Sequence, residues 1–286
     1  MAMDIASIIE QYAQPFLEKY HALLLPGHRR ALDAMLACRK SCGHVHAMCE
    51  SCCQIQSYPL SCGHRSCPKC QNKDATAWLD RQAQKLLPVP YFMVTFTLPC
   101  ELRKLAWQYQ SLIYKLMFDV SADVLKTLAA DPKHGGGSLG MTGVLHTHTR
   151  RLDYHPHIHY IVPGGFLKTA DKQQRFEQVK NDFFIYGDVL AKLFKGRFIE
   201  ALYQQHLPFT KLPDKWVVNV QCIGTGKPAL QYLSRYLYRG VISENKIICN
   251  EQGSVTFLYT DANTQKTQSR TMKGEDFIWH FLQHVL

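Results

Sequence analysis

The 286-residue sequence lacks the features of membrane and secreted proteins. No run approaches the roughly 18 consecutive apolar residues that a membrane-spanning helix needs. The first residues, MAMDIASIIEQYAQPF, include acidic side chains and lack the basic start and small-residue cleavage site of a secretory signal. Internal repeats and low-complexity tracts are also absent. These absences predict a soluble, cytoplasmic protein with no membrane partner.

Acidic residues are fewer than basic residues. The chain has 23 Asp and Glu against 33 Lys and Arg, which gives a formal net charge of +10. Clustered Lys and Arg gain affinity for phosphates by releasing counterions, so the excess of basic residues favours a polyanionic partner such as nucleic acid. The same charge also fits a protein with basic solvated faces, so charge alone does not choose between the two.

Cysteine is scarce outside one segment, where eight of the eleven cysteines fall between Cys38 and Cys70. In a reducing compartment such a cluster indicates metal rather than disulfides. Two C-x-x-C turns, CESC and CPKC, complete a tetrahedral zinc shell and leave no open position for a substrate, so the zinc is structural. The predicted ligands of this zinc are Cys49, Cys52, Cys67 and Cys70.

Further ligand types alternate with these pairs and predict a second zinc in a cross-braced module. Its expected ligands are Cys38, His44, Cys62 and His64. Cys42, His46 and Cys53 are competing choices. Basic residues on and after the last turn, among them Arg65 and Lys69, could meet phosphates or form a solvated face.

The order of expected elements indicates an α+β fold with an antiparallel sheet and helices on one side. Two short helices precede the cysteines, with a kink or break at Pro15, and a helix follows over 72–87. Strands are predicted at 90–99, 141–150, 157–165 and 215–222, a long helix at 102–130, mostly helix over 171–205, and a helix at 227–240. Two weaker strands and a last helix close the chain.

The stretch RLDYHPHIHYIVPGG carries histidines at every second position of a predicted strand. Alternate side chains share a face and lie about 6.6 Å apart, so one ion can use two neighbouring histidines but not all three. Pro156 disturbs the strand beside His155, which favours His157 and His159 as the metal-binding pair. A row of surface histidines without metal is the alternative. For a third ligand, His146 ranks ahead of His148 and Gln231.

The predicted helix QYLSRYLYRG presents Tyr232, Tyr236 and Arg239 on one face and leucines on another. Two tyrosines flanking the core would be the ordinary reading. A tyrosine hydroxyl can also attack a phosphodiester if a divalent cation held by neutral imidazoles polarises the phosphate. The two motifs together therefore predict phosphodiester chemistry.

These motifs resemble the two-tyrosine rolling-circle transposases of bacterial insertion sequences, in the HUH endonuclease class. The similar segments are HVHAMCESC, LSCGHRSCPKC, YFMVTFTLP, GVLHTHTRRLDYHPHIHYIVPGG, YLSRYLYRG and DFIWHFLQHVL. The resemblance implies an N-terminal zinc-binding, DNA-binding module over 1–84 and an HUH catalytic domain over 85–286.

The resemblance further implies that the protein nicks single-stranded DNA at the ends of a transposable element and transfers the strand. Tyr232 and Tyr236 would be the nucleophiles, and His157 and His159, with His146, would hold Mg²⁺ or Mn²⁺. The partners would be single-stranded DNA at transposon termini and target DNA, in a bacterial cytoplasm. The basic residues expected to meet DNA are Arg65, Lys69, Lys73, Arg150, Arg151, Arg235 and Arg239.

The chain also departs from that family. Relatives often carry a histidine where this chain has Ser66, and they continue beyond the terminal HVL with a basic segment. The resemblance therefore implies a truncated C-terminal part. Two alternatives stay open: a rolling-circle replication initiator with the same chemistry, and a non-catalytic zinc-finger DNA-binding remnant of a transposase.

Overall fold

The computed structural model describes residues 4–70, 72–170, 173–179, 185–228, 230–231, 241–261 and 264–285. The chain forms two compact units, each assembled from separate stretches of sequence. The first unit comprises Met1–Trp78, His148–Tyr154 and Ser234–Leu286, and the second comprises Leu79–Thr147 and His155–Leu233. The units do not divide at the domain boundary predicted between residues 84 and 85, and that boundary stays a prediction.

The first unit begins with two helices, α1 (Ile5–Tyr20) and α2 (Pro26–Ala37), joined through the short turn η1 (His21–Leu23). Helix α1 starts where the Asp4 carboxylate accepts a hydrogen bond of 2.7 Å from the Ser7 amide. Pro15 lies inside α1 without ending it, so the expected break falls instead at η1. A proline bends a helix but need not terminate one whose apolar side is buried.

The C-terminal part of the first unit packs against these helices. Strands β9 (Ile247–Glu251), β10 (Ser254–Thr260) and β11 (Thr267–Lys273) form an antiparallel sheet in the order β11-β10-β9, and helix α8 (Gly274–Leu282) follows. The Tyr20 ring stacks on Trp279 at 4.9 Å, and Asp276 accepts a bond of 2.7 Å from Tyr20. The ends of the sequence thus share one core, and the C-terminal sheet has three strands where two were expected.

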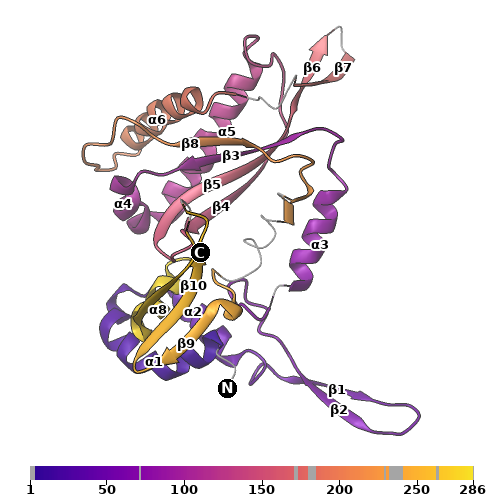
Figure 1. Ribbon diagram of the computed structural model, residues 1–286, viewed down its shortest axis with the longest axis vertical. Helices are drawn as coiled ribbons and strands as arrows, with labels where there is room; N and C mark the ends of the chain where they lie inside the picture. Colours follow the sequence, from indigo (N-terminus) through magenta and orange to yellow (C-terminus); the bar gives the residue numbers. More distant parts are fainter. Residues whose placement is uncertain are drawn as a thin grey trace. The chain divides into compact units, whose positions relative to one another are not determined.

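The cysteine-rich stretch carries a hairpin of β1 (His44–Met48) and β2 (Ile55–Pro59), which pair antiparallel with all ten residues exposed. Figure 1 shows this hairpin as a two-stranded arm within the first unit. Helix α3 (Asn72–Ala83) follows the last cysteine, as the sequence predicted. A short turn, η3 (Glu244–Lys246), precedes β9.

The second unit is built on a four-stranded sheet with the order β4-β5-β3-β8 (Figure 1). Its strands are β3 (Tyr91–Thr97), β4 (Thr142–His148), β5 (Tyr154–Pro163) and β8 (Val218–Cys222). Central strand β3 pairs antiparallel with both β5 and β8. The strands predicted around residues 90–99, 141–150, 157–165 and 215–222 are therefore confirmed.

Helices cover one face of this sheet. They are η2 (Cys100–Leu102), α4 (Arg103–Gln108), α5 (Gln110–Ala130) and α6 (Gly187–Gln204). Phe96 of β3 contacts Phe194 of α6 with ring centroids 5.0 Å apart, and Tyr160 of β5 hydrogen-bonds Ser121 of α5 at 2.8 Å. Because strand side chains alternate, the residues next to Phe96 and Tyr160 lie on the opposite face. The predicted α+β fold with antiparallel sheets and packed helices is confirmed.

Two local predictions in this unit were wrong. Residues 173–178 form strand β7 (Gln173–Gln178), which pairs with β6 (Gly165–Ala170), whereas helix was expected from 171 onward. Gly165 permits this pairing, because a Cβ there would lie 2.3 Å from the Phe176 ring. The long helix expected over 102–130 is divided at Tyr109, which leaves helical geometry. Across the described residues, no helix is long and apolar enough to cross a membrane.

Candidate functional site

Three imidazoles meet on the face of the second unit's sheet opposite α5 and α6. His146 comes from β4, and His157 and His159 come from β5. One ring nitrogen from each lies within 4.8 Å of the others, and the ring centroids are 4.5 to 5.2 Å apart. We call His146, His157 and His159 the histidine triad. The spacing is suitable for one metal ion held by three neutral imidazoles.

Hydrogen bonds from neighbouring backbone and side chains orient two of these rings. The His157 Nδ1 lies 2.7 Å from the His155 carbonyl oxygen, which can only accept, so Nδ1 carries the proton and Nε2 keeps its lone pair. The His159 Nδ1 lies 2.8 Å from the Thr95 hydroxyl, on the strand position directly opposite. Such outer hydrogen bonds fix the ring and its tautomer in metal sites.

The electrostatic environment keeps these rings neutral. Burial, and then the charge of the neighbouring His157, lower the pKa of His159 to about 3. Burial also lowers the pKa of His157, although its hydrogen bond to the His155 carbonyl opposes that shift. Neutral imidazole is the form that binds metal, so His157 and His159 are in the ligating state at neutral pH.

His155 stands outside the triad, as the sequence argument expected. Its Nδ1 lies 2.6 Å from Nη2 of Arg103, the first residue of α4. Of the alternatives for the third ligand, His148 lies elsewhere, because its ring is 5.0 Å from that of His284 in the first unit. Gln231 is exposed. Nothing in the sequence pattern indicated Arg103 or Thr95, because both reach the site through strand and loop pairing.

A second cluster, in the first unit, contains four thiols whose sulfurs lie within 4.8 Å of one another. Its members are Cys38, Cys62, Cys67 and Cys70, which we call the cysteine cluster. Cys38 ends α2, and its sulfur is 3.5 Å from that of Cys70, which in turn is 3.6 Å from Cys62. Four thiolates at this spacing match a closed, structural zinc shell.

Protonation within the cysteine cluster is unequal. Burial raises the pKa of Cys62 to about 11 and raises that of Cys67 as well. Burial also acts to raise the pKa of Cys70, but a hydrogen bond with Cys38 and further bonds outweigh it and lower the pKa to about 7. A bound cation would deprotonate all four thiols, because thiolate is the ligand.

The cysteine cluster divides the ligands differently from the sequence-based assignment. Cys67 and Cys70 meet Cys38 and Cys62, which had been assigned to the other zinc, and they do not meet Cys49 and Cys52. Spacing along the chain identifies pairs, but the fold of the intervening hairpin decides which pairs meet. His64 accepts a bond of 3.2 Å from the Ser66 amide and is not in the cluster, nor is His44 on β1.

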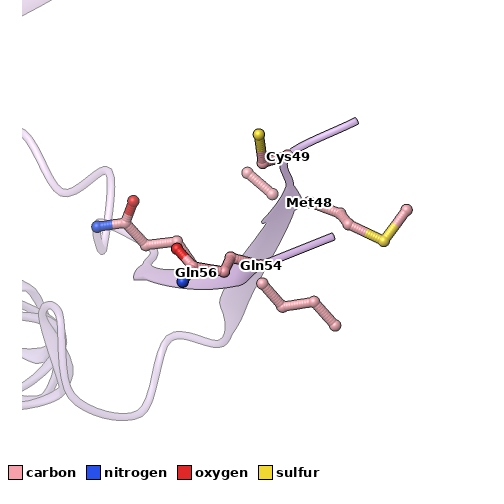
Figure 2. Close-up of a pocket in the computed structure, with 6 residues that line it drawn as sticks. Met48, Cys49, Gln54 and Gln56 are labelled. Carbon is pink, nitrogen blue, oxygen red and sulfur yellow. The ribbon is translucent and has the colours of Figure 1, made fainter. Parts of the chain in front are cut away.

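Cys49 and Cys52 lie at the turn of the β1–β2 hairpin and are exposed. Figure 2 shows Cys49, Met48, Gln54 and Gln56, which line a pocket at the end of the hairpin. A hydrogen bond from Ser51 and further bonds from Cys52 lower the pKa of the Cys49 thiol to about 6. The CESC turn therefore favours the thiolate form of Cys49 even without a bound cation.

The predicted DNA-binding residues that the structure describes lie in the first unit. Arg65 is exposed, while Lys69 forms an ion pair of 2.5 Å with Asp4. Arg150 donates to the Thr260 carbonyl, and Arg151 lies over the Tyr259 ring at 5.9 Å. The predicted nucleophiles Tyr232 and Tyr236, together with Arg235 and Arg239, lie outside the described residues, as does the side chain of Lys73.

The turn 149–153, which connects β4 to β5, is held by the C-terminal part of the first unit. Leu152 adopts a positive φ of 68° and is buried, and its carbonyl accepts bonds from His280 at 3.0 Å and His284 at 3.3 Å. Arg270 donates to Asp153 at 2.8 Å. Sequence reasoning missed this arrangement, because contacts across more than 100 residues leave no local pattern.

The fold and these clusters define a class of protein: an α+β protein with a cysteine-rich module and a separate three-imidazole centre on an antiparallel sheet. Comparison with known families identifies it further. A family model described as "Putative transposase" matches residues 140–286, and one described as "Transposase zinc-binding domain" matches residues 8–98. The chain belongs to this transposase family, which confirms the resemblance to two-tyrosine rolling-circle transposases.

Two curated proteins are similar along most of the chain. "Putative transposase y4qJ" of Sinorhizobium fredii is 33% identical, over 99% of this chain and 77% of that protein. "Transposase for insertion sequence element IS801" of Pseudomonas savastanoi pv. phaseolicola is 28% identical, over 88% of this chain and 65% of that protein. The chain thus spans about two thirds to three quarters of these relatives, and it carries a zinc-binding domain, as expected.

Proposed function

We propose that the protein nicks single-stranded DNA at the ends of a transposable element and transfers the strand through a phosphotyrosine intermediate. The observation that carries this proposal is the histidine triad, whose nitrogens lie within 4.8 Å of one another in a member of a transposase family. The relative named for insertion sequence IS801 supports DNA as the substrate.

The triad fits a divalent cation by its donor set. His157 has its proton fixed on Nδ1, Thr95 occupies the Nδ1 of His159, and the pKa values of both rings are lowered. Mg²⁺ or Mn²⁺ bound there would polarise a non-bridging oxygen of the scissile phosphate. Mg²⁺ prefers oxygen ligands, so Mn²⁺ is the better match to three imidazoles.

Tyr232 and Tyr236 supply the nucleophiles of the chemical step. A tyrosine oxygen attacks phosphorus, the bond to the 3′ oxygen breaks, and that oxygen leaves with the electron pair and takes up a proton. The phenolic proton is released to solvent. The products are a 5′-phosphotyrosine and a free 3′ hydroxyl, and the reverse reaction with another 3′ hydroxyl completes strand transfer.

We also propose that the cysteine cluster holds one structural zinc, in place of the ligand set predicted from spacing. Its four sulfurs satisfy a tetrahedral shell without water. Cys49 and Cys52 of the first predicted set, and His44 and His64 of the second, lie outside this cluster. A second zinc stays a prediction. The module would bring exposed basic residues such as Arg65 to DNA.

The test is covalent adduct formation. Two single-stranded substrates carry an element terminus: one is labelled at its 5′ end, and the other is labelled on the 3′ side of the nick. Each is incubated with protein and Mn²⁺, and the products are separated on a denaturing gel. We expect an adduct with the 3′-side fragment, loss of adduct with EDTA, and loss in the double variants Tyr232→Phe/Tyr236→Phe and His157→Ala/His159→Ala. Binding without an adduct in the intact protein would instead support a non-catalytic DNA-binding remnant.

A further inference from the structure

Arg103 contacts His155, whose ring lies next to that of His157 in the histidine triad. Strand β3 ends at Thr97, opposite His157, and the Leu98 amide continues the pairing with a bond of 3.1 Å to the Pro156 carbonyl. The chain then turns through η2 and starts α4 at Arg103. This path brings the Arg103 Nη2 to within 2.6 Å of the His155 Nδ1.

The chemistry of this contact fixes the state of both groups. A guanidinium only donates, so the His155 Nδ1 accepts, and the His155 ring is neutral with its proton on Nε2. The guanidinium carries a positive charge. Because the His155 ring centroid is 5.3 Å from that of His157, a permanent positive charge is held one imidazole away from the triad.

Arg103 also has a donor that the described part of the protein does not use. Among the ion pairs of the described residues, none joins Arg103 to a carboxylate. Its Nε is buried and has no hydrogen-bond partner within the described part of the chain. A half-buried guanidinium that the described residues leave without an anion is costly, and a ligand can supply that anion.

We propose that Arg103 binds the phosphate of the single strand adjacent to the scissile phosphate, and that His155 positions its guanidinium. The inference rests on the proposed nicking function. Arginine matches phosphate oxygens with paired donors, and the intervening His155 ring places the guanidinium beside, not within, the metal-binding group. Arg103 is therefore a substrate-binding residue, and His155 a positioning residue.

The test combines a charge-neutral backbone with matched variants. Single strands carry a methylphosphonate either one position 5′ or one position 3′ of the scissile phosphate, and binding and single-turnover adduct formation are measured. Removing the phosphate charge at one of the two positions should weaken binding by the wild-type protein about tenfold. Arg103→Ala should weaken binding to the unmodified strand to a similar degree, and should lose no more with the methylphosphonate.

Three controls separate this role from a structural one. Lys104→Ala removes the neighbouring, exposed positive charge on α4 and should keep the full methylphosphonate effect. His155→Asn keeps an acceptor near the Nδ1 position and should bind better than His155→Ala. The slope of log affinity against log salt should fall by about one in Arg103→Ala.

Two results would overturn the inference. One is an equal methylphosphonate loss in Arg103→Ala and wild type at both positions, and the other is wild-type binding by Arg103→Ala. If the wild-type protein forms no adduct on the unmodified strand, the proposed nicking function fails instead. The binding measurements on the same strands still report whether Arg103 contacts a phosphate.

Discussion

At the scale of single residues, the protonation of buried imidazoles links the site to stability. The pKa of His159 is about 3 in the folded protein, against an ordinary value of 6.5. The unfolded chain therefore binds a proton below about pH 6.5 that the folded chain does not. The stabilising contribution of this neutral ring is complete above pH 6.5 and is lost as the pH falls toward 3.

This linkage predicts the pH dependence of unfolding. In metal-free buffer the midpoint of thermal unfolding should fall between pH 7.5 and pH 5.5, and the variant His159→Gln should fall by less, because it lacks the titrating ring. The matched variant His21→Gln changes an exposed imidazole with no assigned role and should behave like the wild type. Equal declines in His159→Gln and wild type would show that this ring is not buried in the neutral form.

Sequence reasoning paired His157 with His159 because strand periodicity alone puts them on one face, and it ranked His146 ahead of His148 without a strand register to decide between them. It could not identify Arg103 or Thr95. Thr95 becomes relevant only through the β3–β5 register, and Arg103 only through the turn that follows β3. Register and loop paths are set by packing across the whole unit, and they leave no signature in a short stretch.

At the scale of elements, the hairpin β1–β2 decides how the cysteines are divided. The hairpin carries Cys49 and Cys52 to its turn, while residues before and after it return together and bring Cys38 to Cys62. A cross-braced pattern and this arrangement share the same spacing of residues. Only the pairing of the hairpin strands in the folded chain distinguishes the two arrangements.

This division predicts a particular pattern of zinc loss. Cys38→Ser and Cys67→Ser should each remove one zinc per chain, measured by elemental analysis, and the double variant should remove no more than either single one. Both residues serve the same ion in the cysteine cluster. Cys100→Ser, an exposed cysteine outside the cluster, is the control. A double variant that loses one zinc more than each single variant would instead support the assignment from spacing.

At the scale of the whole molecule, the first unit joins both ends of the sequence. Helix α1 packs on α8, and Tyr12 of α1 lies so close to Gly274 that a Cβ there would be 2.2 Å from the Tyr12 ring. Helices predicted from periodicity in each end gave no indication that they would pack together, because such contacts depend on the fold between them. A zinc-binding match over residues 8–98 and a transposase match over 140–286 are likewise silent on this packing.

The shared core predicts a sharp effect of one methyl group. Gly274→Ala should destabilise the protein by about 1–3 kcal/mol, because the ring of Tyr12 must move to admit the Cβ. Gly27→Ala, in α2, meets nothing within 4 Å and should be neutral or slightly stabilising. Urea unfolding measures both changes. A Gly274→Ala variant as stable as Gly27→Ala would show that α1 and α8 are not packed in this way.

The central claim is that a tyrosine of the 227–240 segment attacks DNA at a metal centre built from the histidine triad. The most direct measurement is mass spectrometry of trypsin-digested adduct, formed with Mn²⁺ on a single-stranded terminus. The account predicts a nucleotide on Tyr232, in the peptide 216–235, or on Tyr236, in the peptide 236–239. Attachment to Tyr238 or to a residue outside these peptides, or an adduct that forms equally well in His157→Ala/His159→Ala, would contradict it.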